Sequence, residues 1–351
     1  MRFVFIMMLL LSSLSVFAGV KTNPDISLNS LFLLRGGTEG NSPQSEKPNG
    51  FSLQEAELRL TSNIDTYFRG DVVLALEKEA SENPGEEGKY IVEPEEAFVE
   101  TLGLEGISLR IGKFYPFWGR SNQWHTHSFP FIDTLQTREA IFGEEGFNES
   151  GLAVSYLFPL PWYTEFVAQA FSAQNRAVFG SNSQDDWAGV YFLKSLWDLS
   201  ELSTLELDLG YGNGRDLDSR ANHIYNAALT YKNKWSSFRT LVGTAEYTLA
   251  QRVYDEAGSS QGRRSALSSW LQYQFSRQWW VQGRHEIVFD AEKIQDKELR
   301  KNSVLVAFVP SEYSAIRLQY DNIDNPSLLK NEERVTLQFN FSMGTHPSHN
   351  Y

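Results

Sequence analysis

Hydrophobic and polar residues alternate with a period of two along most of the chain after residue 25. One representative run alternates leucine with acidic side chains over five positions: Leu205, Glu206, Leu207, Asp208 and Leu209. This alternation is typical of a β-strand that has one apolar and one polar face. Counting such runs predicts about sixteen strands and no amphipathic helix of comparable length. The pattern therefore predicts an all-β protein.

The connections between these predicted strands alternate between long and short. The long ones include Lys78–Val92 and Phe114–Glu149, and the short ones include Gly103–Gly106, Pro159–Pro161 and Lys232–Lys234. Outer-membrane barrels have this asymmetry, with short periplasmic turns and longer extracellular loops. We therefore expect a transmembrane antiparallel up-and-down β-barrel of about 16 strands, with both chain ends on the periplasmic side. A secreted all-β protein is the alternative, although it has no reason to keep the alternation.

The first eighteen residues have the three parts of a secretory signal peptide. Arg2 is the charged start, Phe3–Leu11 is an apolar run, and Val16-Phe17-Ala18 is a small-x-small cleavage site. A membrane anchor is the alternative, but a spanning helix needs about 20 apolar residues. We expect residues 1–18 to be the signal peptide, 19–351 to form the outer-membrane barrel, and 344–351 to be a periplasmic tail.

Composition narrows the function. The net charge is −13, and it becomes −14 once the only charge of the signal peptide, Arg2, is removed. This acidity argues against nucleic-acid binding, which requires a basic face. The absence of cysteine excludes disulfides and thiolate metal sites. The sequence also lacks the phosphate-loop and His-Glu-x-x-His motifs. We therefore expect neither an enzyme nor a cofactor.

A barrel of this size leaves a water-filled channel, whereas an eight-stranded barrel is filled by side chains. The predicted function is that of a porin or ion channel in the outer membrane of a Gram-negative bacterium. Its partners would be outer-membrane lipid and small hydrophilic solutes or ions that diffuse passively through it. The acidic balance predicts a mild cation bias and no strong phosphate preference. A non-conducting receptor or adhesin, and a metal-related uptake protein, are the alternatives.

The polar phase of each strand supplies candidates for the channel lining. Charged residues on the polar face of a strand, or in the segment that follows Phe114, can tune which ions enter a pore. The alternative for any one of them is that it only keeps the wall polar. The candidates are Arg59, Arg69, Asp71, Arg110, Lys113, Arg120, Glu206, Asp208, Arg284, Glu286 and Arg317.

The longest connection, Phe114–Glu149, is dense in Phe, Trp and His. That composition suits a segment packed inside the barrel, although packing on the outside is an alternative. Within it, His125 and His127 are two residues apart and could share a metal ion, with the carboxylate of Asp133 as a third ligand. Two histidines without a fixed third ligand make this a weak metal-site signal.

Two resemblances sharpen the interpretation. The run Leu109–Gly119, with the sequence LRIGKFYPFWG, resembles the signature of the phosphate-selective porin O and P type family. This resemblance implies a porin whose third loop sets the constriction, and it leaves a homotrimer open. A weaker likeness, to predicted zinc-regulated outer-membrane receptors, is carried by His125–Asp133 and Gly344–His349. The phosphate-selective family implies a channel rich in Lys and Arg, from which this acidic chain departs.

Overall fold

A computed structural model describes residues 24–38, 49–78, 89–144, 146–180, 186–255, 258–290, 298–325 and 331–345. The predicted signal peptide lies outside the described residues, as do most of the Lys78–Val92 connection and the tail beyond Thr345. None of the helices among the described residues has the length and hydrophobicity needed to cross a membrane.

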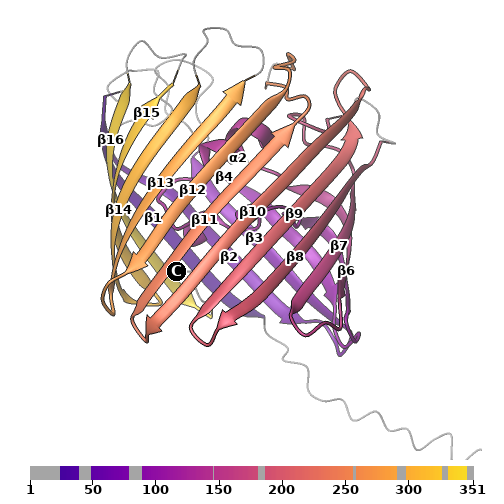
Figure 1. Cartoon of the computed structure of the whole chain (residues 1–351), viewed down its shortest axis with the longest axis horizontal. Helices are drawn as coiled ribbons and strands as arrows, with labels where there is room; N and C mark the ends of the chain where they lie inside the picture. The colour runs from indigo at the N-terminus through magenta and orange to yellow at the C-terminus, as the bar shows by residue number, and fades with distance from the viewer. Residues whose placement is uncertain are drawn as a thin grey trace, which may run out of the picture.

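Sixteen strands form one closed antiparallel barrel (Figure 1). Each strand pairs with its neighbours in the sequence, and β1 pairs with β16 to close the ring. The predicted all-β, sixteen-stranded, up-and-down barrel is confirmed. The strands are β1 (Asp25–Gly37), β2 (Gly50–Asn63), β3 (Phe68–Lys78), β4 (Tyr90–Thr101), β5 (Ile107–Phe114), β6 (Glu149–Leu157), β7 (Tyr163–Phe171), β8 (Ala188–Ser200), β9 (Ser203–Arg215), β10 (Ala221–Ser236), β11 (Arg239–Ala250), β12 (Arg264–Gln274), β13 (Trp279–Asp290), β14 (Leu299–Ser311), β15 (Ser314–Asp324) and β16 (Glu332–Gly344).

The two ends of the barrel differ as predicted, with short turns at one end and long connections at the other (Figure 1). Ser27 pairs with Gly344, so the barrel begins and ends at the end that carries the short turns. One predicted turn is wrong, because Lys232–Lys234 lies within β10 and the chain reverses at residues 237–238. Three consecutive polar residues resemble a turn, but here they form the water-facing end of a long strand.

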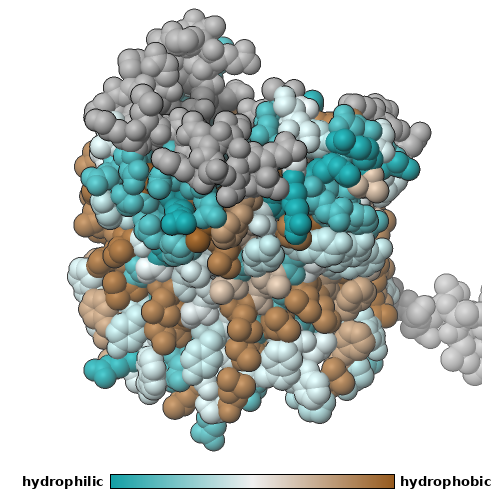
Figure 2. Space-filling model, turned by 45° about the horizontal axis from the view of Figure 1, so that its top comes forward, coloured by the Kyte–Doolittle hydropathy of each residue, from teal (hydrophilic) through white to brown (hydrophobic). Residues whose placement is uncertain are grey.

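The two faces of the wall have opposite polarity. In β16, Gln338 is fully buried on the inner face, while Phe341, three positions further on, is 47% exposed on the outer face. Hydrophobic residues accordingly gather over the side of the barrel, below a hydrophilic rim (Figure 2). An apolar outside and a polar inside reverse the arrangement of a soluble protein and suit a wall that contacts lipid.

Aromatic residues at the strand ends mostly face outward. Trp162, Trp187, Trp235 and Trp279 are all exposed, as expected of a ring of aromatics at the membrane surface. Trp280, which directly follows Trp279, instead points inward and is buried. Successive residues of a strand face opposite sides, so Trp279 and Trp280 cannot both contact lipid.

Candidate functional site

The connection between β5 and β6 folds into the barrel, and it carries the short helices η2 (Thr126–Ser128) and α2 (Gln136–Phe142) (Figure 1). We call residues 115–148 the inner loop. Its backbone bonds to widely separated parts of the wall. Ile132 N donates to Gln319 of β15, Ile132 O accepts from Gln54 of β2, and Phe117 N donates to Gln169 of β7. A single segment that reaches these three strands must lie inside the ring, as its composition indicates.

Aromatic side chains explain why the inner loop stays there. Phe142 and Phe147 stack at 5.0 Å between ring centroids, and Trp118 packs edge-on against both. A second group, built on Phe131 of the loop, contacts Trp280 and other apolar residues of the inner wall. Each fully buried aromatic side chain stabilises the fold by about 1.5–3 kcal/mol. The aromatic side chains of this segment therefore form the packing between the inner loop and the wall.

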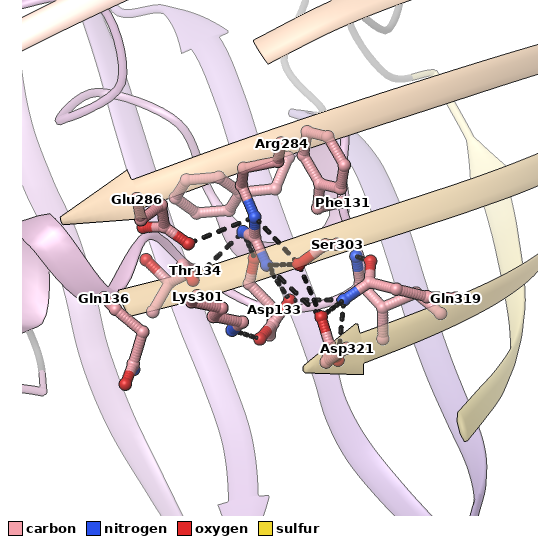
Figure 3. A network of polar contacts seen from close by, with 12 residues as sticks. Phe131, Asp133, Thr134, Gln136, Arg284, Glu286, Lys301, Ser303, Gln319 and Asp321 are labelled. Carbon is pink, nitrogen blue, oxygen red and sulfur yellow. Dashed lines mark hydrogen bonds and ion pairs between the residues drawn. The ribbon is translucent and has the colours of Figure 1, made fainter. Parts of the chain in front are cut away.

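The middle of the inner loop is fixed by a charged network around Asp133 (Figure 3). Arg284 Nη2 lies 2.8 Å from Asp133 Oδ1, Arg334 Nη2 lies 3.1 Å from Oδ2, and Lys301 Nζ also contacts Oδ2. Gln319 donates to the same carboxylate over 2.7 Å. We call these residues, together with Asp321 and Glu286 beside them, the Asp133 anchor.

The Asp133 anchor is balanced in charge. Arg334 and Arg284 also contact Asp321, Arg284 contacts Glu286, and Arg334 contacts Glu332. Arg35 lies within electrostatic reach of the same group, so four cations face four carboxylates. The guanidinium of Arg284 further stacks on the ring of Phe131, 4.4 Å from its centroid. Burial alone would raise the pKa of Asp133, but the three basic side chains outweigh burial and hold that pKa well below its usual range. The loop carboxylate is therefore ionised at neutral pH.

Another part of the inner loop is held by acidic residues. His125 Nδ1 lies 3.0 Å from Glu95 Oε2 and 3.3 Å from Glu57 Oε2, while His125 Nε2 lies 3.0 Å from Glu96 Oε2. His127 Nδ1 lies 3.0 Å from the same Glu57 oxygen. We call these five residues the His125 anchor. Burial would lower the pKa of His125, but the three glutamates outweigh burial and raise that pKa well above its ordinary value.

β-Bulges aim two of the wall residues at the loop. The pairing of β3 with β4 skips one residue, so Glu95 has no partner and points inward beside its neighbour Glu96. A second skip, between β1 and β2, leaves Gln54 unpaired, and Gln54 then bonds to the backbone of Ile132. A bulge adds one residue to a strand and redirects its side chain. Strict alternation could not have found either residue.

Most of the channel-lining candidates lie on the inner face and are ion-paired. Arg59 and Arg69 contact Asp71 at 2.6 and 3.3 Å, while Arg110 contacts Glu100 at 2.8 Å. Arg120 of the loop and Lys194 both contact Glu206. The buried group comprises Asp71, Glu206, Asp208, Arg284, Glu286 and Arg317. Arg317 donates to the backbone of Phe129 in the inner loop over 2.6 Å.

Two sequence-based placements differ from the structure. Lys113 pairs with Ala97 and Ser150 on the outer face and donates to the carbonyl of Pro94, so it does not line the lumen. It lies three positions after Arg110, and an odd spacing in a strand changes the face. Asp133 does not lie beside the two histidines, because it forms ion pairs with Arg284 and Lys301 in the Asp133 anchor.

Sequence reasoning missed most of the wall residues that hold the loop. Glu57, Lys301 and Arg334 all lie on inward positions of regular strands, so the period-two phase could have found them. Glu95 lies on a bulge and left no such signal. Glu246 of β11, which accepts from Arg120 N and Ser121 Oγ, is a further wall residue of this kind.

A closed sixteen-stranded barrel with an apolar outside, a polar inside and a long loop folded within has the architecture of an outer-membrane porin. Solved structures with this fold include the outer membrane channel DcaP of Acinetobacter baumannii, with a TM-score of 0.57 and 12% identity over 92% of this chain and 96% of DcaP. OprB of Pseudomonas putida has a TM-score of 0.61 and 9% identity over 92% and 94% of the two chains. The anion-selective porin from Comamonas acidovorans has a TM-score of 0.54 and 11% identity over 91% and 98%.

Sequence comparison does not assign the chain to a particular family of porins. No family model matches it, so the resemblance to the phosphate-selective porin O and P type family is not confirmed. An uncharacterized protein of Aquifex aeolicus (strain VF5) is 27% identical, over 93% of this chain and 75% of that protein. The structural neighbours are 9–12% identical and show the fold alone.

Proposed function

We propose that this protein is a porin through which small hydrophilic solutes or ions diffuse passively across a bacterial outer membrane. The observation that carries the proposal is the polar inner face of a closed barrel that the inner loop partly fills. A loop fixed to both β2 and β15 narrows the lumen, and it acts as the constriction of the channel. The fold shared with an outer membrane channel and an anion-selective porin supports the same function.

Weak ion selectivity is part of this proposal. Each water-accessible basic candidate on the inner face has a carboxylate partner: Asp71 for Arg59 and Arg69, Glu100 for Arg110, and Glu206 for Arg120. Lys194 also contacts Glu206, and Asp208 and Glu246 lie close to this group, so five basic side chains face five acidic ones. Paired charges leave little excess of one sign to concentrate counter-ions. The net charge of −14 expected for the exported chain then produces only a mild cation bias, which salt screens over about 10 Å at 0.1 M.

Conductance of single molecules in a planar lipid bilayer tests the function. The purified barrel should give stable open channels in KCl, with a reversal potential close to zero under a salt gradient. A heat-unfolded sample is the control for detergent artefacts. A barrel that inserts without conducting would contradict the porin proposal and favour a receptor or adhesin.

The orientation, export and assembly of the chain are further parts of the proposal. We infer that the end with short turns faces the periplasm and that residues 1–18 direct export. An epitope inserted at Gly85-Glu86 should then be labelled on intact cells. Labelling only after permeabilisation would reverse the orientation. Chemical cross-linking in native membranes tests whether the barrel forms a homotrimer.

A further inference from the structure

We propose that the His125 anchor binds one divalent transition-metal ion of the zinc type, with Glu57, Glu95 and His125 as ligands and His127 as the fourth. The site lies where the inner loop meets β2 and β4, away from the Asp133 anchor. A bound ion would fasten the loop to the wall through coordinate bonds. The inference concerns binding alone and does not depend on whether the barrel conducts.

The donor atoms already have the spacing of a metal site. One ligand atom from each of Glu57, Glu95 and His125 lies within 4.8 Å of the others. His125 Nδ1 is 3.3 and 3.0 Å from the two carboxylate oxygens, and His127 Nδ1 is 3.0 Å from the Glu57 oxygen. Zinc binds nitrogen and oxygen at about 2.0–2.1 Å, which places neighbouring ligands of a tetrahedral site roughly 3.3 Å apart.

Groups around the ligands orient them for coordination. Glu96 Oε2 lies 3.0 Å from His125 Nε2, an arrangement in which Nε2 donates to the carboxylate and Nδ1 keeps its lone pair for a metal. Tyr115 donates its hydroxyl to Glu95 Oε1 over 3.0 Å, which leaves Oε2 facing the histidine. Carboxylate–histidine–metal arrangements of this kind are usual around protein-bound zinc.

One buried atom of the site has no hydrogen bond. Glu57 is 1% exposed, and its Oε1 has no hydrogen-bond partner in the described part of the chain. An unpartnered buried carboxylate oxygen is costly, because burial removes its water without replacing it. A cation bound by Glu57 would give this oxygen a partner, either by contacting Oε1 or by binding both carboxylate oxygens.

The charge of the cluster points to a cation as well. Within the described residues, the ion pairs of Glu57, Glu95 and Glu96 all involve the two histidines. Arg59 also acts electrostatically on Glu57 and Glu96, but its guanidinium is paired with Asp71, so the glutamates remain in excess. Glu55 is buried on the same face of β2 and adds a further carboxyl group. A divalent ion would offset this excess. Imidazole ligands favour zinc-like ions over calcium and magnesium, which prefer oxygen donors alone.

Calorimetric titration of the folded, chelator-treated barrel with ZnCl₂ in detergent tests the site. We expect saturable binding of one ion per chain, and Co²⁺ should bind with visible absorption bands of a four-coordinate site. Glu57→Gln and His125→Gln should each weaken binding at least tenfold, and Glu96→Gln should weaken it by about 10–100-fold. Circular dichroism and retarded migration of the unheated protein on a denaturing gel confirm that each variant is folded.

Three matched controls give the test its specificity. Glu246→Gln alters a buried glutamate that holds another part of the loop, and His223→Gln alters an outward-facing histidine that contacts Tyr211. Both variants should bind zinc like the parent protein. The third, His346→Gln with His349→Gln, removes the tail histidines. Absence of saturable binding, or binding that Glu57→Gln and His125→Gln leave intact while the tail variant abolishes it, would overturn the proposal.

Discussion

Both anchors hold the inner loop to the wall, but the signs of the charges on loop and wall are reversed between them. At Asp133, the loop supplies one carboxylate, and the wall supplies basic residues that are themselves balanced by Asp321 and Glu286. At His125, the loop supplies imidazoles and the wall supplies glutamates in excess. In the first network, each carboxylate has a basic partner supplied by the protein. In the second, three glutamates share two histidines, and this excess is the basis on which we propose that it binds a cation.

Asp133→Asn should have the largest effect on this comparison. The substitution leaves Arg284, Lys301 and Arg334 buried with one carboxylate fewer, and breaking a buried ion-pair network costs about 3–5 kcal/mol. We expect the loop to loosen and single-channel conductance to rise, with a lower urea midpoint followed by tryptophan fluorescence. Glu333→Gln, at an exposed position of β16, is the control. Unchanged conductance and stability would show that this anchor does not hold the loop.

His125→Gln should have an intermediate effect when measured without divalent metals. The variant loses hydrogen bonds to ionised groups, which contribute about 1.5–3 kcal/mol, but it also relieves the burial of a charged imidazole. The same conductance and urea experiments measure it. A destabilisation larger than that of Asp133→Asn would reverse the ranking of the two anchors.

The double variant Arg69→Ala, Arg110→Ala tests two basic residues of the wall that belong to neither anchor. Both arginines are paired with carboxylates, so we expect normal stability and a small shift of the reversal potential toward cations. Reversal potentials under a tenfold KCl gradient measure it. A strongly anion-selective parent channel that loses this preference in the variant would instead support the phosphate-porin resemblance.

The smallest expected effect is the response of the Asp133 anchor to pH. The pKa of Asp133 in the folded state lies below its unfolded value of about 3.9, so the anchor's contribution is complete above about pH 5. It is lost only as pH falls through the lower, folded-state pKa. The difference in stability between Asp133→Asn and the parent protein should therefore stay constant from pH 8 to pH 5. A difference that shrinks within this range would contradict the assigned shift.

The wall of this protein could be predicted from the sequence, whereas the contacts inside it could not. Alternation is a local property, and it located all sixteen strands because lipid requires an apolar residue at every second position. β4 shows its limit, since the strand begins at Tyr90 although regular alternation is readable only from about Ala97. Pro94 interrupts the pattern there and lies next to the bulge at Glu95.

The anchors depend on pairings that no local pattern records. His127 meets Glu57 across 70 residues of chain, and the bulge that brings Glu95 to His125 shifts the phase of β4. The two histidines were recognisable as candidate ligands. Their glutamate partners were not, because only the closed barrel brings β2, β4 and the loop together.

The long separation between Asp133 and Arg334 also bears on the order in which the chain folds. These residues are 201 positions apart, and Gln54 and Gln338, which bond across the β1–β16 seam region, are 284 apart. Contacts of such separation carry a large loop-closure entropy and form slowly. The Asp133 anchor would therefore be completed only when the last strand arrives, so seam closure and completion of this anchor belong to one late kinetic step. Until that step, a nascent chain exposes both an unpaired strand edge and the aromatic face of the loop.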